Sequence, residues 1–204
     1  MLTVRRQAFN IAFNTTESVY EFHKSHPEHG KNFATMIGNL EHEVSTKNAF
    51  GQGYPWDTIG DNIAGGTVVD IGGSIGTSSI LLARRFPNLK FIVQDLPGPI
   101  ASGKDAVPAD VSERVEFVVH DFFTEQPVNA DAYFFRYIFH NWGDRKVLEI
   151  LRALVPALRP GAKVIINDYI LPEPGSMDIA QERRARCVCA YQPTFAHTRC
   201  LTRD

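Results

Sequence analysis

From residue 67 onward, short apolar runs alternate with stretches in which apolar residues recur every three or four positions. Runs that are apolar on both faces are typical of strands in a buried parallel sheet, and the stretches between them fit connecting helices. We predict strands near residues 68–71, 89–94, 115–120, 132–136 and 163–168, and helices near 77–86, 99–106 and 144–158. The alternation indicates an α/β fold whose parallel sheet is covered on both sides.

The first 50 residues predict helices only. Thr15 or Thr16 is a suitable N-cap for a short helix, and Pro27 is a suitable first residue for another that runs to Leu40. A turn-rich connector follows and leads into the first predicted strand. We therefore expect three segments: a helical region over 1–50, an α/β domain over 51–182 and an atypical tail over 183–204 that shows neither helical nor strand periodicity.

Composition restricts the classes of partner. The 204 residues are 44% hydrophobic and carry a formal net charge of −2, which gives no electrostatic case for nucleic acid or an anionic membrane. No stretch approaches the length of a transmembrane helix, and the start of the chain lacks the apolar core of a signal peptide, so we expect a cytoplasmic protein. No metal is expected either, because Cys187, Cys189 and Cys200 lack the spacing of a structural zinc site.

Candidate chemistry begins where the first predicted strand ends, in Asp70-Ile-Gly-Gly-Ser-Ile-Gly76. Glycines there let a ligand approach the backbone closely, and Asp95, at the tip of the next strand, is placed to bind both hydroxyls of a ribose. The spacing differs from the Gly-x-Gly-x-x-Gly of nicotinamide and flavin sites. An acid before a small-x-small-x-small loop favours S-adenosylmethionine, since Asp70 could attract its positive end directly or through water. A tight strand-to-helix bend is the alternative interpretation of the glycines alone.

Five ordered motifs add a family resemblance. They are Val68–Gly73, Val93–Pro97, His120–Phe123, Phe135–Asp144 and Leu158–Gly161. Over roughly residues 5–186, the chain resembles the S-adenosylmethionine-dependent O-methyltransferases of the plant caffeate type, and especially their fungal secondary-metabolism branch. The resemblance implies a Rossmann-like class I methyltransferase sheet, a small hydroxylated aromatic or polyketide-type substrate, and a homodimer formed through a preceding winged-helix domain.

The resemblance also implies roles for single residues. His140, in the His-x-Trp-x-Asp motif, would be the general base that removes the hydroxyl proton. The implied cofactor contacts are Gly72, Gly73, Asp95, Asp121 on the adenine amine, Phe122 on an adenine face, and Arg136 through its backbone carbonyl.

Five further residues near these motifs receive weaker expectations. Phe123 is an equal candidate for the ring that stacks on adenine, while Met36 and Trp56 match positions near the cofactor or the acceptor only weakly. We expect Trp142 to pack rather than react, and Asp144 to cap the helix that follows it.

The chain departs from the family pattern at both ends and in the glycine loop. Its first 48 residues match only the last helices of the dimerisation domain, and the tail lacks the family's closing strand pair. We therefore expect a sheet that is incomplete at its C-terminal edge, and we expect the acids that orient His140 to be missing. Ser74 replaces the middle glycine of the loop. Two alternatives to methyl transfer follow: an impaired remnant that binds the cofactor or a partner, and a rearrangement without methyl transfer.

Overall fold

A computed structural model describes residues 8–17, 19–33, 35, 53–60, 65–168 and 178. The expectations for Met36, the three cysteines and the tail over 183–204 lie outside the described residues.

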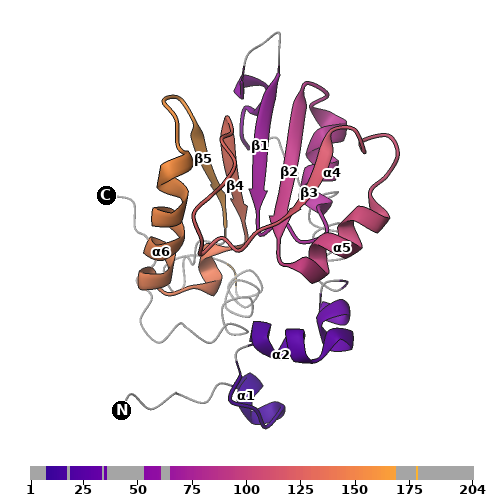
Figure 1. Cartoon of the computed structure of the whole chain (residues 1–204), viewed down its shortest axis with the longest axis vertical. Coiled ribbons are helices and arrows are strands. Elements are labelled where there is room, and N and C mark those ends of the chain that lie inside the picture. Colours follow the sequence, from indigo (N-terminus) through magenta and orange to yellow (C-terminus); the bar gives the residue numbers. More distant parts are fainter. Residues whose placement is uncertain are drawn as a thin grey trace.

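Five parallel strands form one sheet in the order β3-β2-β1-β4-β5 (Figure 1). The strands are β1 (Gly66–Ile71), β2 (Leu89–Asp95), β3 (Val115–Val119), β4 (Ala132–Arg136) and β5 (Lys163–Asn167). Every predicted strand is confirmed. The strand order reverses between β1 and β4, and open α/β sheets bind ligands at the carboxyl ends of their strands beside such a reversal.

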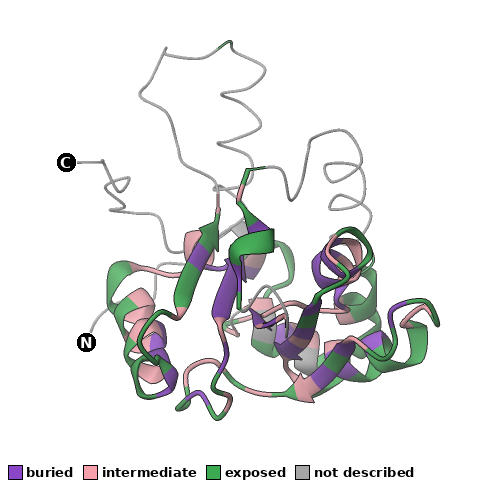
Figure 2. Cartoon of the chain, turned by 90° about the horizontal axis from the view of Figure 1, so that it is seen from above, coloured by how far each residue is buried: buried purple, intermediate pink, exposed green. Residues whose placement is uncertain are grey.

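Helices cover both faces of this sheet, as the alternation predicts. Leu82 of α4 (Thr77–Arg85) and Ile100 of α5 (Pro97–Ala106) pack into one apolar cluster with one face of the sheet, whereas Ile150 of α6 (Asp144–Leu154) packs into a second cluster on the opposite face. Figure 2 shows the buried residues concentrated along the strands and the inner sides of these helices.

The helix predicted over 144–158 is confirmed with two corrections. It becomes the 3₁₀ helix η3 (Val155–Ala157) at its end, where Pro156 lacks the N–H that an α-helix needs. Its N-cap is Gly143, so Asp144 is the first helical residue and makes no capping hydrogen bond. The expectation that Asp144 caps the helix is therefore wrong, although a carboxylate in the first turn still favours the helix dipole.

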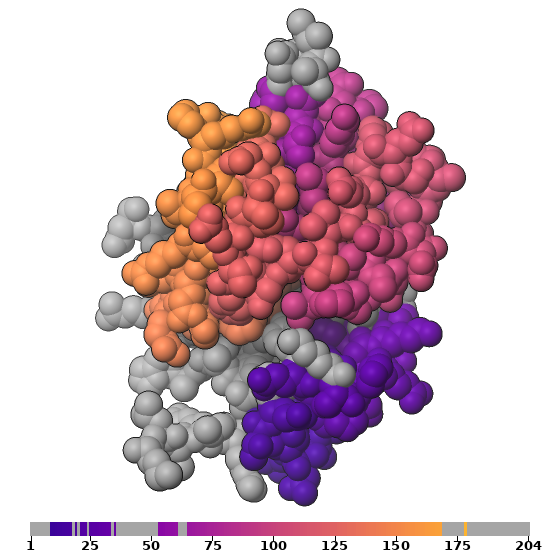
Figure 3. Space-filling view, in the orientation of Figure 1, coloured from indigo at the N-terminus to yellow at the C-terminus, as the bar shows by residue number. Residues whose placement is uncertain are grey.

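The N-terminal residues are helical as far as they are described. The helices are α1 (Ala8–Ala12) and α2 (Val19–Ser25), followed by helical residues over 27–33, and they lie at one end of the molecule (Figure 3). Thr15 accepts a hydrogen bond from the Glu17 backbone N–H through its Oγ1 at 3.1 Å, in the turn that leads into α2. Phe22 is buried and stacks on the His26 ring at 3.9 Å between centroids, which places His26 in an aromatic cluster.

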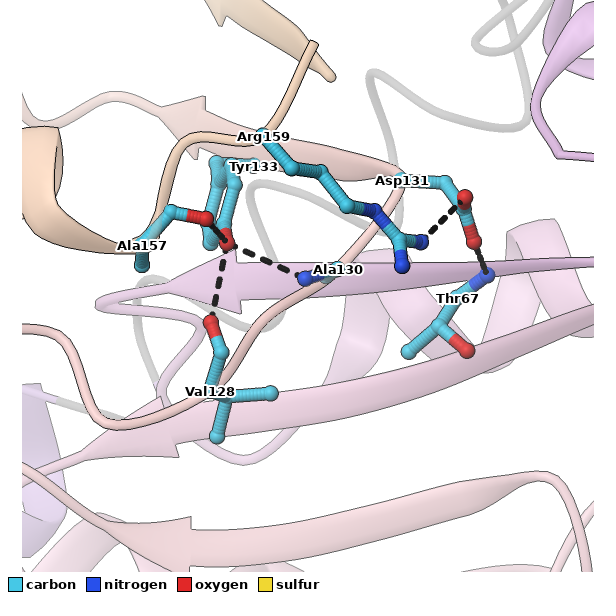
Figure 4. Close-up of polar contacts among 7 residues, drawn as sticks. All are labelled: Thr67, Val128, Ala130, Asp131, Tyr133, Ala157 and Arg159. Carbon is cyan, nitrogen blue, oxygen red and sulfur yellow. Dashed lines mark hydrogen bonds and ion pairs between the residues drawn. The ribbon is translucent and has the colours of Figure 1, made fainter. Parts of the chain in front are cut away.

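Near the amino ends of β1 and β4, polar side chains hold the sheet to its connections (Figure 4). The buried Tyr133 hydroxyl accepts from the Ala130 N–H at 3.0 Å and lies 2.9 and 2.8 Å from the carbonyls of Val128 and Ala157. Asp131 accepts from the Thr67 N–H and pairs with Arg159. These contacts stabilise the end of the sheet opposite to the candidate site.

Trp56 lies in the short 3₁₀ helix η1 (Trp56–Thr58), where it is 2% exposed. Its ring contacts Phe86, Phe134 and Tyr54 in the cluster beneath α4. The weak expectation that Trp56 lies near the cofactor or acceptor is therefore not met, because its ring is a core side chain.

Across the part of the chain that the structure describes, every helix is too short or too polar to span a bilayer.

Candidate functional site

The loop after β1 brings bare backbone to the carboxyl end of the sheet. Gly72 has φ +70°, and both it and Gly73 donate their N–H groups to the Gln94 carbonyl, at 2.8 and 3.1 Å. A Cβ on Gly72 would lie 2.5 Å from the Ile138 Cδ1, and one on Gly73 would lie 2.7 Å from the Asp70 carboxyl carbon. Neither position has room for a side chain, because atoms of Ile138 and Asp70 already fill the space, so the close packing around the loop requires glycine at both positions.

Asp95 ends β2 and faces this loop. Its Oδ2 accepts from the Ser74 N–H at 2.8 Å and its Oδ1 from the Leu96 N–H at 2.7 Å. An ionised carboxylate has about four lone-pair sites, so acceptor capacity remains for two hydroxyls. Burial raises the pKa of Asp95 above its ordinary value, and the two backbone hydrogen bonds oppose that rise.

Asp70, near the end of β1, supports the glycine loop. Its carboxylate is 1% exposed and accepts a hydrogen bond from the Ser79 hydroxyl, on α4, at 2.6 Å. This burial and the Ser79 contact support a structural role for Asp70 in holding the glycine loop. The contact ties the end of β1 to the start of α4.

Asp121 and the two phenylalanines after it form a turn beside the glycine loop. The Asp121 Oδ1 accepts from the Phe123 N–H at 3.0 Å, and the Thr124 hydroxyl donates to the Asp121 carbonyl at 2.6 Å. Phe122 is the ring next to the loop, since its Cε1 lies 3.5 Å from where a Cβ of Gly72 would stand. The ring of Trp142 packs edge-on against both phenylalanines, which confirms that it serves packing.

Arg136, at the end of β4, has a buried side chain. It is 6% exposed, donates from Nη1 to the Ser78 hydroxyl at 2.8 Å, and lies 4.8 Å from the centre of the Tyr137 ring. No specific role for this side chain is expected from the sequence. Its contacts show that the guanidinium links β4 to the first turn of α4, while its backbone ends the strand beside the glycine loop.

His140 lies in the 3₁₀ helix η2 (Phe139–Asn141), just past β4, where the sequence places it. Its Nδ1 is 2.6 Å from the Asp168 Oδ1, and its backbone N–H donates to the Asp168 Oδ2 at 3.1 Å. A carboxylate only accepts, so Nδ1 carries the hydrogen and Nε2 of the neutral ring is left with its lone pair. The side chains of His140 and Asp168 are only 10% and 12% exposed.

Asp168 corrects the expectation that the acids orienting His140 are missing. It directly follows β5, and because β5 pairs in parallel with β4, their carboxyl ends lie together. The signal was present in the sequence: Asp168 stands at the end of a predicted strand, as Asp95 does. What the sequence lacks is the strand order that makes β4 and β5 neighbours.

Within the described ranges, no group of three or more His, Cys, Asp or Glu side chains is arranged to hold a metal ion.

Known proteins match this arrangement in sequence and in structure. A family model described as an O-methyltransferase domain matches residues 2–192. The "Grayanic acid biosynthesis cluster O-methyltransferase" of Cladonia grayi is 44% identical over 97% of this chain and 44% of its own length. The chain thus spans less than half of that relative.

Two solved structures share the fold. The protein titled "A Pericyclic Reaction enzyme" has a TM-score of 0.72 and 29% identity, over 90% of this chain and 47% of that one. The O-methyltransferase NcsB1 from neocarzinostatin biosynthesis, solved with S-adenosylmethionine and 2-hydroxy-5-methyl naphthoic acid, has a TM-score of 0.68 and 26% identity, over 79% of this chain and 47% of that one.

The parallel sheet, its glycine loop and its strand order define a Rossmann-like methyltransferase fold. The chain belongs to the O-methyltransferase family of the plant caffeate type, and its relatives of known name include enzymes of fungal natural-product biosynthesis.

Proposed function

We propose that the chain is the catalytic part of an S-adenosylmethionine-dependent O-methyltransferase that acts on a hydroxyl of a small aromatic or polyketide-type natural product. The pairing of His140 with Asp168 carries the proposal, because it supplies an oriented base at the sheet end that also bears the glycine loop and Asp95. S-adenosylmethionine, when bound, supplies a methyl group on a sulfonium, an electrophile for an oxygen nucleophile.

The residues at the carboxyl ends of the strands, which we call the cofactor crevice, fit such a cofactor. Gly72 and Gly73 carry no side chain that could stand between the loop backbone and a ligand, and Asp95 retains lone pairs for the ribose hydroxyls. Asp121 and Phe122 follow β3 on the adjoining side, where we assign them to the adenine amine and one adenine face. The Arg136 backbone carbonyl is assigned to the methionine moiety. None of these roles requires a metal.

His140 would act on the acceptor. Its Nε2 takes the hydroxyl proton as the oxygen forms its bond to the methyl carbon and the carbon–sulfur bond breaks, leaving S-adenosylhomocysteine and a methyl ether. Asp168 keeps the ring hydrogen on Nδ1, so that Nε2 is the basic nitrogen, and it stabilises the imidazolium that forms. A general base in a fixed position contributes roughly 10²–10⁴-fold to a rate.

Methyl transfer from labelled S-adenosylmethionine tests the proposal. The chain, and a full-length version with the flanking segments its relatives have, would be incubated with phenolic polyketides and hydroxynaphthoic acids, since NcsB1 was solved with a compound of that class. We expect a labelled methyl ether with wild type and a much slower reaction with His140→Gln. A folded full-length protein that binds S-adenosylhomocysteine but methylates no acceptor would favour the impaired remnant instead.

A rearrangement without methyl transfer is the second candidate, favoured by the likeness to the pericyclic reaction enzyme. Here the bound sulfonium would act only through its charge. Product mass distinguishes the two: an isomer of the substrate, formed without loss of the labelled methyl, identifies a rearrangement.

The segment boundaries at 50 and 182 and the family homodimer belong to the same proposal. Limited proteolysis should cut near these boundaries, and sedimentation of the full-length protein should show a dimer.

A further inference from the structure

The connection between β3 and β4 carries two proposed adenine contacts but has no regular structure of its own. Over residues 120–131 the chain has neither helix nor strand, and it runs over the sheet face that α6 covers, where Phe122, Phe123 and Val128 join the second apolar cluster. A segment without a hydrogen-bond ladder needs other contacts to hold one position. The question is what fixes Asp121 and Phe122 relative to Asp95.

A pair of buried amides provides that contact. Gln94 and Gln126 are 1% and 6% exposed, and each side chain donates to the other, at 2.9 and 2.7 Å. Gln94 of β2 lies in a cross-strand row of the sheet, in which its neighbour on β1 is Ile71 and the next residue, on β4, is Phe135. A buried amide costs free energy unless it is hydrogen-bonded, so Gln94 selects one position of Gln126 over others.

Both glutamines make further hydrogen bonds, Gln94 to the glycine loop and Gln126 to α6 and to its own connection. The Gln94 carbonyl accepts the N–H groups of Gly72 and Gly73, and the next residue is Asp95. Gln126 donates its backbone N–H to the Ala153 carbonyl of α6 at 2.9 Å, and its Oε1 accepts from the Val128 N–H at 3.0 Å. One amide pair thus connects the glycine loop to the connection that bears Asp121.

A small cavity lies beside this pair. It measures about 10 Å³ and is lined by His120, Phe122, Thr124 and Gln126, among others. The Nε2 of His120 is buried and has no hydrogen-bond partner among the described residues. This volume is close to that of one ordered water molecule, so packing contacts are missing on one side of Gln126 and its hydrogen bonds carry more of the contact between the connection and the sheet there.

We infer that Gln94 and Gln126 are positioning residues that set the distance between the ribose side and the adenine side of the cofactor crevice. The inference rests on the proposed function for its cofactor. Without the pair, the sheet keeps its strands, but the Asp121 turn loses its fixed place beside Gly72, and cofactor affinity falls although neither glutamine touches the cofactor.

The test uses Gln94→Leu/Gln126→Leu, in which both partners become apolar so that no side-chain amide is left buried alone, and in which the Val128 N–H loses its acceptor as it also does in Gln126→Leu. Single Leu variants, which do leave one unpaired, should be less stable than the double variant. Tyr133→Phe is the matched control, because it removes a buried hydrogen-bonding group at the opposite end of the sheet.

Amide hydrogen exchange without ligand comes first. We expect faster exchange at Gly72, Gly73 and Phe123 in the double variant and unchanged exchange there in Tyr133→Phe. Calorimetry with S-adenosylhomocysteine follows. We expect the double variant to bind it about tenfold more weakly than wild type, while its melting temperature is no lower than that of Tyr133→Phe. A Kd within about twofold of wild type, or unchanged exchange, would overturn the inference. Wild type that shows the protected amides but binds no S-adenosylhomocysteine would overturn the proposed function together with the cofactor link.

Discussion

His140 and Asp168 are joined twice, since the two oxygens of one carboxylate accept from the imidazole Nδ1 at 2.6 Å and from the His140 backbone N–H at 3.1 Å. The two bonds fix the ring and its tautomer together. A base that is 10% exposed cannot rely on water for this orientation. Asp168 therefore belongs to the proposed mechanism as a positioning residue.

Replacing Asp168 with Asn should slow methyl transfer roughly 10²-fold or more, because an amide can donate to Nδ1 and so shift the hydrogen to Nε2. The Kd of S-adenosylhomocysteine should not change. Single-turnover rates and calorimetry would measure the two effects. The control is Asp144→Asn, which changes an exposed acid shortly after His140 in the chain. It should retain the wild-type rate. Equal rates for Asp168→Asn and wild type would remove Asp168 from the mechanism.

Asp95 should make cofactor affinity depend on pH. Burial raises its pKa, so the carboxylate becomes protonated at a higher pH than an ordinary aspartate as the solution is acidified. A protonated carboxyl accepts hydroxyl hydrogen bonds less well, and affinity for S-adenosylhomocysteine should fall through that range. Asp95→Asn should bind about tenfold more weakly at neutral pH and lose this acid dependence. A titration series by calorimetry checks both statements, and identical pH profiles would contradict them.

The backbone conformation of Ser74 should lower the free energy of unfolding. It has φ +53°, a left-handed conformation that is unfavourable for any residue with a Cβ. Ser74→Gly should raise the free energy of unfolding by up to about 1 kcal/mol, since relief of strain is partly offset by the greater freedom of glycine in the unfolded chain. Ser74→Val, with a branched Cβ, should lower it. Urea unfolding would rank the three chains, and the reverse order would show that the Ser74 side chain stabilises the loop.

Tyr133→Phe should lower the free energy of unfolding by about 1–3 kcal/mol, because it leaves the Ala130 N–H and nearby carbonyls without their buried partner. Tyr54→Phe is a suitable control: no hydrogen bond to its hydroxyl occurs among the described residues. Thermal unfolding of both variants would test the difference. Similar losses would mean that the ring, and not the hydroxyl, holds this end of the sheet.

The strands could be read from the sequence because each is largely apolar on both faces and has a polar or glycine residue at its end or directly after it. The same logic placed His140 past β4 and Asp95 at the tip of β2. Asp168 was missed because its contact with His140 depends on the order of strands, which no local pattern encodes. The Gln94–Gln126 pair was missed for a related reason, since polar residues in a loop and at a strand end show no periodicity that links them.

The strain at Ser74 and the burial of Trp56 also required coordinates. A serine in a glycine-rich loop is small enough to pass as a neutral substitution, and only its φ reveals a cost. Trp56 lies within the turn-rich connector, where sequence alone does not say which side of the sheet a ring reaches.

Because the strand order reverses between β1 and β4, the crevice is divided between two uninterrupted stretches of chain. Residues 66–123 hold the groups assigned to the nucleoside, and residues 136–168 hold the base and its carboxylate partner. Gln126, which lies between the two stretches, is tied to α6 through the main-chain carbonyl of Ala153, which any amino acid would supply. The second stretch is thus a natural unit for exchange between relatives, and chimeras joined after residue 131 offer a way to transplant new acceptor chemistry onto an unaltered nucleoside half.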